Sequence, residues 1–324
     1  MELARLERYK MQKFLKNEKI LLLIFILFFM LSWFFLPNYA INTICFSFCN
    51  GLVILGLLIL MRAGLISFGH GMYYCLGGYA VAMTYNFFNI KEAILLTFIA
   101  LLVGFFVSFL LGFFVRRFRG IFFAMLNMAL SMILFGIIVK SVSLGSTDGF
   151  GIKNVTYLGQ VIEGDQRLNT YSYSFIIFIS GIFMYAVLKF LNSPAGKVLE
   201  AIKENEIRAS YLGINVNLHL HKIYIFSSML AALGGGLMVL LVGHITPEDT
   251  AYWTKSGEFV FVAILSGSTN VFAPIIGSLF FEFIRSYTLF YFPNTWQMII
   301  GIILILGIIY LPDGIGSIFR KSRK

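Results

Sequence analysis

Few residues in this 324-residue chain have the type and spacing that catalysis requires. None of its four histidines stands in the spacing of a metal-ligand motif. The glycine-containing stretch LGSTDGFGIK (144–153) lacks the Gly-Lys pair of a phosphate-binding loop. Glu282 is the one clear carboxylate within an apolar run. The sequence therefore predicts no enzyme and no metal or cofactor held by this chain, and it favours a conduit.

Glu282 and Arg285 lie three residues apart within the apolar run 272–292. That spacing places both side chains on one face of a helix, where they can form an ion pair. Pairing would lessen the desolvation cost of placing each charge in hydrocarbon. A role in a solute pathway and a structural contact between helices both remain open for this pair.

The segment AGLISFGHGMYYCLGGYA (63–80) places glycines among polar side chains within an apolar run. One interpretation is a helix packed through small residues, with His70 bonded to a neighbouring carbonyl. The other is a break in the helix that offers free backbone N–H and C=O groups to a ligand. Composition favours packing, but Gly69 and Gly71 on either side of His70 are also typical of a local break.

The stretch SPAGKVLEAIKENEIRASYLGINV (193–216) is too charged to enter a bilayer. Ser193 has the residue type of a helix N-cap, Pro194 that of the first helical position, and Gly213 that of a C-terminal stop. Apolar residues recur near helical spacing on one face, and charges of both signs occupy the others. A helix on lipid headgroups would carry a basic face, so the mixed charge favours docking against another protein.

The elements that position these residues follow from composition. Hydrophobic residues make up 59% of the chain and charged residues 12%, about half the charged share of a soluble domain. The apolar runs are continuous, whereas the strands of a membrane β-barrel would alternate. A helix needs about 20 apolar residues to cross a bilayer. The predicted fold class is therefore an all-α polytopic membrane protein with about ten transmembrane helices.

Ten apolar runs are predicted as spans: 20–36, 39–61, 64–86, 92–115, 120–143, 172–191, 218–243, 257–265, 272–292 and 295–311. Six basic residues precede the first run and four follow the last. Because basic residues mark the cytoplasmic side, we expect cytoplasmic N- and C-termini. If 257–292 forms only a shallow hairpin, eight spans remain and the orientation is unchanged.

The same rule divides the chain into three parts. A basic cytoplasmic segment (1–19) precedes the transmembrane domain (20–319), and a basic tail (320–324) follows it. Within the transmembrane domain, the polar stretch 192–217 is expected in the cytoplasm. The loops 144–171 and 244–256 are expected outside.

Six collinear segments resemble the permease subunits of branched-chain amino-acid ABC importers of the LivM type. They are GLISFGHGMYYCLGGYA (64–80), RFRGIFFAMLNMALSMILF (117–135), GSTDGFGI (145–152), SPAGKVLEAIKENEIRASYLGINV (193–216), ITPEDTAYWTKSGE (245–258) and YLPDGIGSIF (310–319). The similarity runs from about residue 39 to residue 319, nearly the whole chain.

The resemblance implies a multi-pass protein of the bacterial cytoplasmic (inner) membrane, surrounded by lipid. Its implied partners are a second, LivH-like permease subunit, two ABC ATPase subunits that use ATP, and an extracytoplasmic solute-binding protein; nucleic acid is not expected. The cytoplasmic loop of the family contacts an ATPase. Here the loop maps to 200–213, and the expected coupling residues are Glu200, Ala201, Glu204, Asn205, Glu206, Arg208 and Gly213.

The sequence and the resemblance together predict the permease subunit of an ATP-driven importer for a small polar solute, with branched-chain amino acids as the leading substrate class. Urea or a short amide is one alternative, and a self-contained secondary transporter or channel is another. We expect alternating access, in which the docked helix 197–212 tilts the spans. The expected pathway residues are Ser67, Phe68, Gly69, His70, Tyr74 and Asn127.

Overall fold

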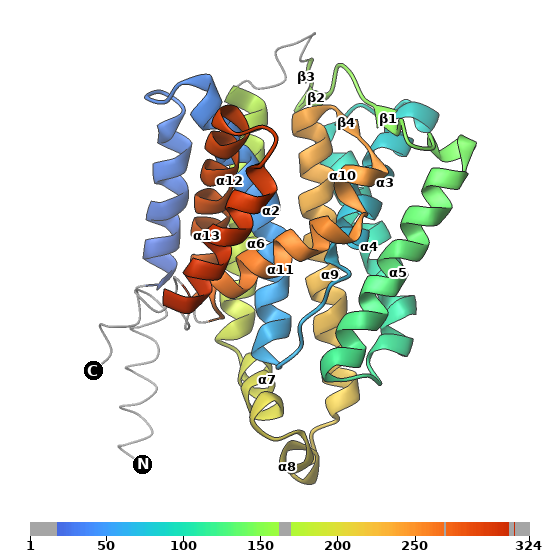
Figure 1. Cartoon of the computed structure of the whole chain (residues 1–324), viewed down its shortest axis with the longest axis vertical. Helices are drawn as coiled ribbons and strands as arrows, with labels where there is room; N and C mark the ends of the chain where they lie inside the picture. Colours follow the sequence, from blue (N-terminus) through green and yellow to red (C-terminus); the bar gives the residue numbers. More distant parts are fainter. Residues whose placement is uncertain (1–17, 162–169, 269, 311–313, 315–324) are drawn as a thin grey trace.

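A computed structural model describes residues 18–161, 170–268, 270–310 and 314. Most of its helices run along the long axis of the molecule (Figure 1). After a first helix at 18–32, the longer helices are α2 (Asn38–Arg62), α3 (His70–Phe88), α4 (Ala93–Val115), α5 (Gly120–Lys140), α6 (Thr170–Leu191), α9 (Val216–Val242), α12 (Ala273–Tyr291) and α13 (Trp296–Tyr310). The shorter ones are η1 (Val142–Leu144), α7 (Pro194–Glu204), α8 (Glu206–Tyr211), α10 (Pro247–Thr250) and α11 (Trp253–Ser266).

Five of the described helices are long and apolar enough to cross a bilayer, namely α2, α4, α5, α6 and α9. The 27 residues of α9 rise about 40 Å, more than the roughly 30 Å of hydrocarbon in a bilayer. These helices confirm an all-α polytopic membrane protein. The count of ten spans and the cytoplasmic placement of the termini stay predictions.

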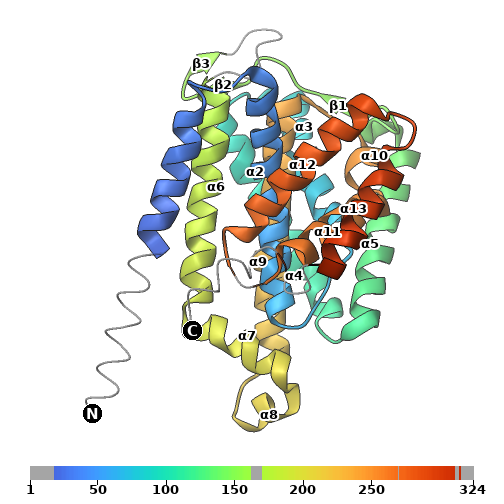
Figure 2. The ribbon, with the colours of Figure 1, turned by 60° about the vertical axis from the view of Figure 1, so that its left-hand side comes forward.

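The polar segments that the sequence assigns to opposite sides of the membrane lie at opposite ends of the molecule (Figures 1 and 2). α7 and α8 form the lower end. The upper end carries two small antiparallel sheets, which pair β1 (Phe150–Gly151) with β4 (His244–Ile245) and β2 (Thr156–Tyr157) with β3 (Gln160–Val161). In the register of the first sheet, Phe150 stands opposite Ile245.

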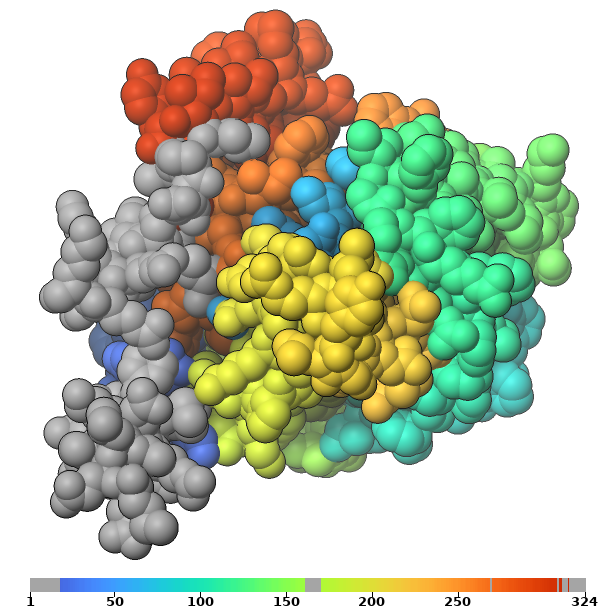
Figure 3. Space-filling model, turned by 90° about the horizontal axis from the view of Figure 1, so that it is seen from below, coloured from blue at the N-terminus to red at the C-terminus, as the bar shows by residue number. Residues whose placement is uncertain are grey.

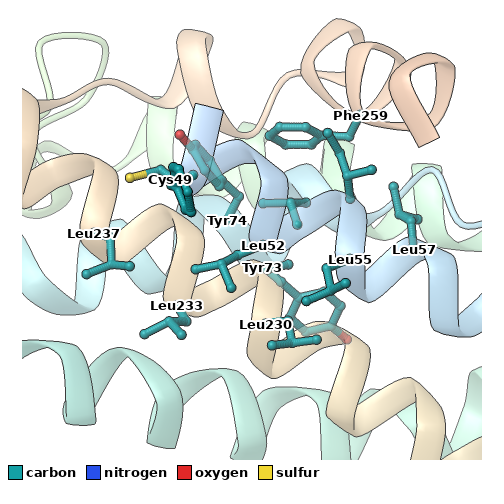
Figure 4. Close-up of a cluster of buried hydrophobic side chains, with 14 of the residues drawn as sticks. Cys49, Leu52, Leu55, Leu57, Tyr73, Tyr74, Leu230, Leu233, Leu237 and Phe259 are labelled. Atoms are coloured by element: carbon teal, nitrogen blue, oxygen red, sulfur yellow. The ribbon is translucent and has the colours of Figure 1, made fainter. Parts of the chain in front are cut away.

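The centre of the bundle is formed by α2 and α9. Of the most apolar 18-residue window of each helix, 89% of α2 and 72% of α9 is buried, against 28% of α4 and 22% of α5. A helix that is apolar on all sides is expected to be buried, and α2 fits that pattern. Leu52 and Leu55 of α2 meet Leu230 and Leu233 of α9 around Tyr73 of α3 (Figure 4).

α3 crosses α9 at very short range because both helices carry glycine at the crossing. A Cβ atom on Gly77 would clash with the backbone carbonyl of Ala232, and one on Gly235 would clash with the carbonyl of Tyr74. Small residues that let two backbones approach are a common basis of helix packing in membranes. This crossing fixes α3 against the core.

Two predicted spans differ from the observed helices. Residues 64–69 of the span 64–86 are not helical, and α3 begins only at His70. The run 257–265 belongs to α11, whose 14 residues reach about 21 Å, too short to cross hydrocarbon; α11 lies obliquely across the bundle (Figures 1 and 2). The predicted tail 320–324 and nearly all of the predicted segment 1–19 fall outside the described residues.

Candidate functional site

The chain re-enters the molecule between α2 and α3. α2 ends at a left-handed glycine, Gly64 (φ 76°), with the N–H of Leu65 bonded to the carbonyl of Leu60 at 3.0 Å, as in a Schellman motif. Residues 64–69 then return from the lower end toward the middle of the bundle, where α3 begins (Figure 1). The break in the predicted span therefore precedes His70.

Polar groups of α9 and α11 converge on the start of α3. The His70 Nε2 lies 2.7 Å from the Oγ of Ser227 in α9. The N–H of Gly71 donates to the Oγ of Ser256 in α11 at 3.0 Å. All of these side chains are buried. One imidazole nitrogen, the His70 Nδ1, has no hydrogen-bond partner within the part of the chain that the structure describes.

A second set of hydrogen bonds, beside this group, leads to α5; its first residue, Tyr73, has its ring 6.4 Å from that of His70. The Tyr73 hydroxyl donates to the Tyr224 hydroxyl at 2.9 Å, and the Tyr224 hydroxyl donates to the Oδ1 of Asn127 at 2.7 Å. The Nδ2 of Asn127 donates to the carbonyl of Phe123 at 2.8 Å. We call the buried set of Ser67, His70, Tyr73, Asn127, Tyr224, Ser227 and Ser256 the polar centre.

The inner face of α5 closes the polar centre from one side. A Cβ atom on Gly69 would lie 2.8 Å from the carbonyl oxygen of Asn127, so the two backbones are in contact. One turn further along α5, the Ser131 hydroxyl donates to the carbonyl of Ala251 at 2.9 Å. A helix break and a close helix contact therefore meet at Gly69, and His70 bonds a serine hydroxyl instead of the expected carbonyl; exposure of the broken backbone to a ligand stays a prediction.

The structure brings together four of the six predicted pathway residues: Ser67, Gly69, His70 and Asn127. Phe68 is partly exposed and packs at the edge of the core. Tyr74 lies apart from the polar centre. Its ring packs against Phe259 at 5.2 Å between centroids, and its hydroxyl points toward Cys49 (Figure 4).

Sequence reasoning missed Tyr73, Tyr224, Ser227 and Ser256. A signal for Ser227 was present, because two adjacent serines interrupt the apolar run 218–243. A second signal, for a polar face on α5, was the spacing of Asn127 and Ser131, which are four residues apart and share one face of the helix. Ser256 carried no comparable signal, since its role depends on how α11 crosses the bundle.

The predicted ion pair between Glu282 and Arg285 is wrong. The Glu282 carboxylate accepts a hydrogen bond from the Nδ2 of Asn50 at 2.7 Å. Arg285 lies 3.7 Å from the Glu258 carboxylate, which also binds Lys255 at 3.0 Å. Helix spacing allowed the pair, but α2 and α11 supply closer partners. No group of three potential metal ligands occurs among the described residues.

The cytoplasmic helix predicted at 197–212 is two helices. Ser193 caps α7 by accepting a hydrogen bond from the N–H of Gly196 at 3.4 Å, and Pro194 is its first residue, as predicted. Asn205 then adopts an extended conformation and caps α8, accepting from the N–H of Arg208 at 2.9 Å. A left-handed Gly213 (φ 85°) follows α8, which confirms the predicted stop.

The predicted coupling residues separate into two groups. Glu200 pairs with Arg62 at 3.4 Å, and Glu206 pairs with Arg119 at 2.8 Å. Glu204, Asn205, Arg208 and Gly213 are exposed, and Ala201 is half-buried. Sequence reasoning did not mark the exposed apolar surface of α8, which consists of Ile207, Tyr211 and Leu212, 66%, 86% and 75% exposed.

Comparison with known proteins identifies the family. The family model described as the permease component of the branched-chain amino acid transport system matches residues 39–308. The chain belongs to this family. The permease is 23% identical to the high-affinity branched-chain amino acid transport system permease protein LivM of Salmonella typhimurium. It is 24% identical to the LivM protein of Escherichia coli K12.

Both alignments extend over 306 residues and cover 84% of the permease and 69% of the relative. No solved structure matches the permease significantly. The family match spans α2 through nearly all of α13, and so it includes both the polar centre and the α7–α8 segment. It confirms the resemblance seen in the sequence and assigns the chain to transport permeases.

Proposed function

We propose that this permease is the translocation subunit of an ATP-driven importer in a bacterial cytoplasmic membrane. It works with a second, LivH-like permease subunit, two ABC ATPase subunits and an extracytoplasmic solute-binding protein. Its solute is small and polar, with branched-chain amino acids as the leading class and urea or a short amide as the alternative. The observation that carries this proposal is the exposed apolar surface of α8.

This surface lies at the end of the molecule that the sequence assigns to the cytoplasm, which supports contact with an ATPase. α8 protrudes from the lower end of the molecule, beyond the ends of the long helices (Figures 1 and 2), and the α7–α8 segment stands out in the view from below (Figure 3). Burying Ile207, Tyr211 and Leu212 in a partner would contribute roughly 1.5–3 kcal/mol for each fully buried side chain. A self-contained channel has no need for such a surface, so α8 favours a partner protein.

The polar centre suits a zwitterionic solute. α3 begins inside the bundle, and the positive end of its dipole at His70 attracts a carboxylate. The free His70 Nδ1 and the non-helical backbone of 64–69 supply further hydrogen-bonding groups. These features support passage of an amino acid beside Gly69 during alternating access.

Tyr211→Asp should release the ATPase subunits, because it places a charge in the apolar contact. We expect the ATPase that co-purifies with the permease to fall at least tenfold, while the amount of permease in the membrane stays unchanged. Val142→Asp is the matched control, since Val142 is also apolar and 88% exposed but lies near the opposite end. Normal co-purification with Tyr211→Asp would contradict the docking assignment.

Uptake of labelled leucine into proteoliposomes that contain the full complex tests the function itself. We expect uptake that requires ATP and is competed by unlabelled isoleucine and valine. Competition by urea or acetamide in place of these amino acids would assign the alternative solute class. Uptake by the permease without ATPase subunits would instead establish a self-contained transporter.

A further inference from the structure

Arg119 joins the starts of three helices at the lower end of the molecule. It is the residue before α5, and its Nε and Nη2 donate to the carboxylate of Glu206, the first residue of α8, at 2.8–3.2 Å. Nη2 also donates to the Oδ1 of Asn217, in the first turn of α9, at 2.9 Å. A guanidinium that binds a carboxylate through two nitrogens holds distance and orientation together.

Few other contacts fasten α8 to the bundle. Ala209 is its one buried residue, whereas α7 buries both Leu199 and Ile202. The space-filling view from below shows the α7–α8 segment beside the green surface where α4 ends and α5 begins (Figure 3). α8 is joined through the backbone to α7 and to α9, and the side chain of Arg119 connects it to α5.

Of the two long helices that Arg119 joins to α8, α5 is the less deeply packed, with 22% of its most apolar window buried against 72% for α9. α9 lies in the core, whereas α5 forms the outer edge of the bundle (Figure 1). Along α5 a single stripe is buried, and it consists of Phe123, Asn127, Ser131 and Ile138. The same stripe closes the polar centre, since Asn127 contacts Gly69. Tilting α5 would uncover the start of α3.

We propose that the Arg119–Glu206 contact transmits the movement of α8 to α5 and thereby opens the polar centre. Arg119 and Glu206 are positioning residues that act through α5 and touch no solute. This inference rests on the proposed function, because an ATPase must move α8. Beyond that function, α5 is the helix that moves, and the Arg119–Glu206 contact moves it.

A charge-swap experiment on the full complex tests the inference. Arg119→Glu and Glu206→Arg each set like charges against each other, and we expect each to lower ATP-driven leucine uptake at least tenfold while ATP hydrolysis persists. Combining both substitutions restores the attraction, and uptake should recover to within about threefold of the parent. Glu206→Gln introduces no repulsion and should lower uptake less than Glu206→Arg. It replaces the charge reversals as the test variant if those fail to assemble.

Arg117→Glu is the matched control, because Arg117 lies in the same loop and is exposed. It makes the same charge change and should leave the ratio of uptake to ATP hydrolysis unchanged. Movement of α5 away from the bundle is measured by thiol labelling of Ser131→Cys, because Ser131 has no exposed area. Its thiol labelling should rise severalfold with ATP in the parent background and stay low with Arg119→Glu.

The outcomes separate the inference from the proposed function. If the parent complex shows no ATP-driven uptake, the proposed function fails and the inference fails with it. If the parent transports and Arg119→Glu transports and labels equally well, the inference alone is overturned. Failure of the charge swap to recover more uptake than either single substitution would also overturn it.

Discussion

Replacing Gly69 with leucine is expected to stop uptake while the permease still assembles in the membrane. The Gly69 backbone contacts that of Asn127, and a Cβ atom would already lie 2.8 Å from the Asn127 carbonyl oxygen. α5 can yield to the larger side chain because only one narrow stripe of it is buried. The leucine would then stand between α5 and the start of α3, beside the polar centre. We expect uptake to fall more than tenfold, with complex yield and ATP hydrolysis within about twofold of the parent.

Gly136→Leu is the matched control for this substitution. Gly136 lies in α5, and a Cβ atom there would meet nothing within 4 Å. The same change at that position should leave both yield and uptake near the parent values. Normal uptake by Gly69→Leu would remove the polar centre from the solute path, and loss of the assembled complex would leave Gly69 a packing role alone.

Gly77→Leu is expected to prevent the folded permease from accumulating. α3 and α9 approach so closely at Gly77 that a Cβ atom would clash with the Ala232 carbonyl. Both helices belong to the core, so neither can shift without unpacking its neighbours. Overpacking of a close-packed core typically costs 1–3 kcal/mol and occasionally more, and here the obstacle is backbone rather than a flexible side chain.

The amount of monodisperse permease in detergent measures this effect, and we expect at least a tenfold loss. Gly301→Leu in α13 provides the comparison, since a Cβ atom at Gly301 meets nothing within 4 Å. Normal yield from Gly77→Leu would show that the crossing of α3 and α9 is looser than described.

Properties that depend on local sequence were predicted well. The apolar runs located most of the long helices because about 20 apolar residues are needed to cross a bilayer. Ser193 and Gly213 marked the start of α7 and the end of α8, since capping depends on a few neighbouring residues. The split at Asn205 was missed because one helix and two short helices share the same apolar spacing.

Properties that depend on how helices meet could not be read from the sequence. The i, i+3 spacing permitted a Glu282–Arg285 pair, but only the packing of α2 and α11 reveals Asn50 and Glu258 as the partners. Likewise, in the sequence Arg119 is only one of three basic residues between the apolar runs 92–115 and 120–143. The contact between Arg119 and Glu206 appears only when α8 is placed beneath α5.

The most direct test of a solute path at the start of α3 is thiol labelling of Ser67→Cys during transport. Ser67 has no exposed area. The chain's own cysteines, Cys45, Cys49 and Cys75, are buried, so labelling of the parent protein measures the background. In the full complex we expect labelling to rise severalfold with ATP, to slow when excess leucine is present, and to block uptake once complete. Labelling that ignores both ATP and leucine, in a complex that still transports, would contradict passage of the solute beside Gly69.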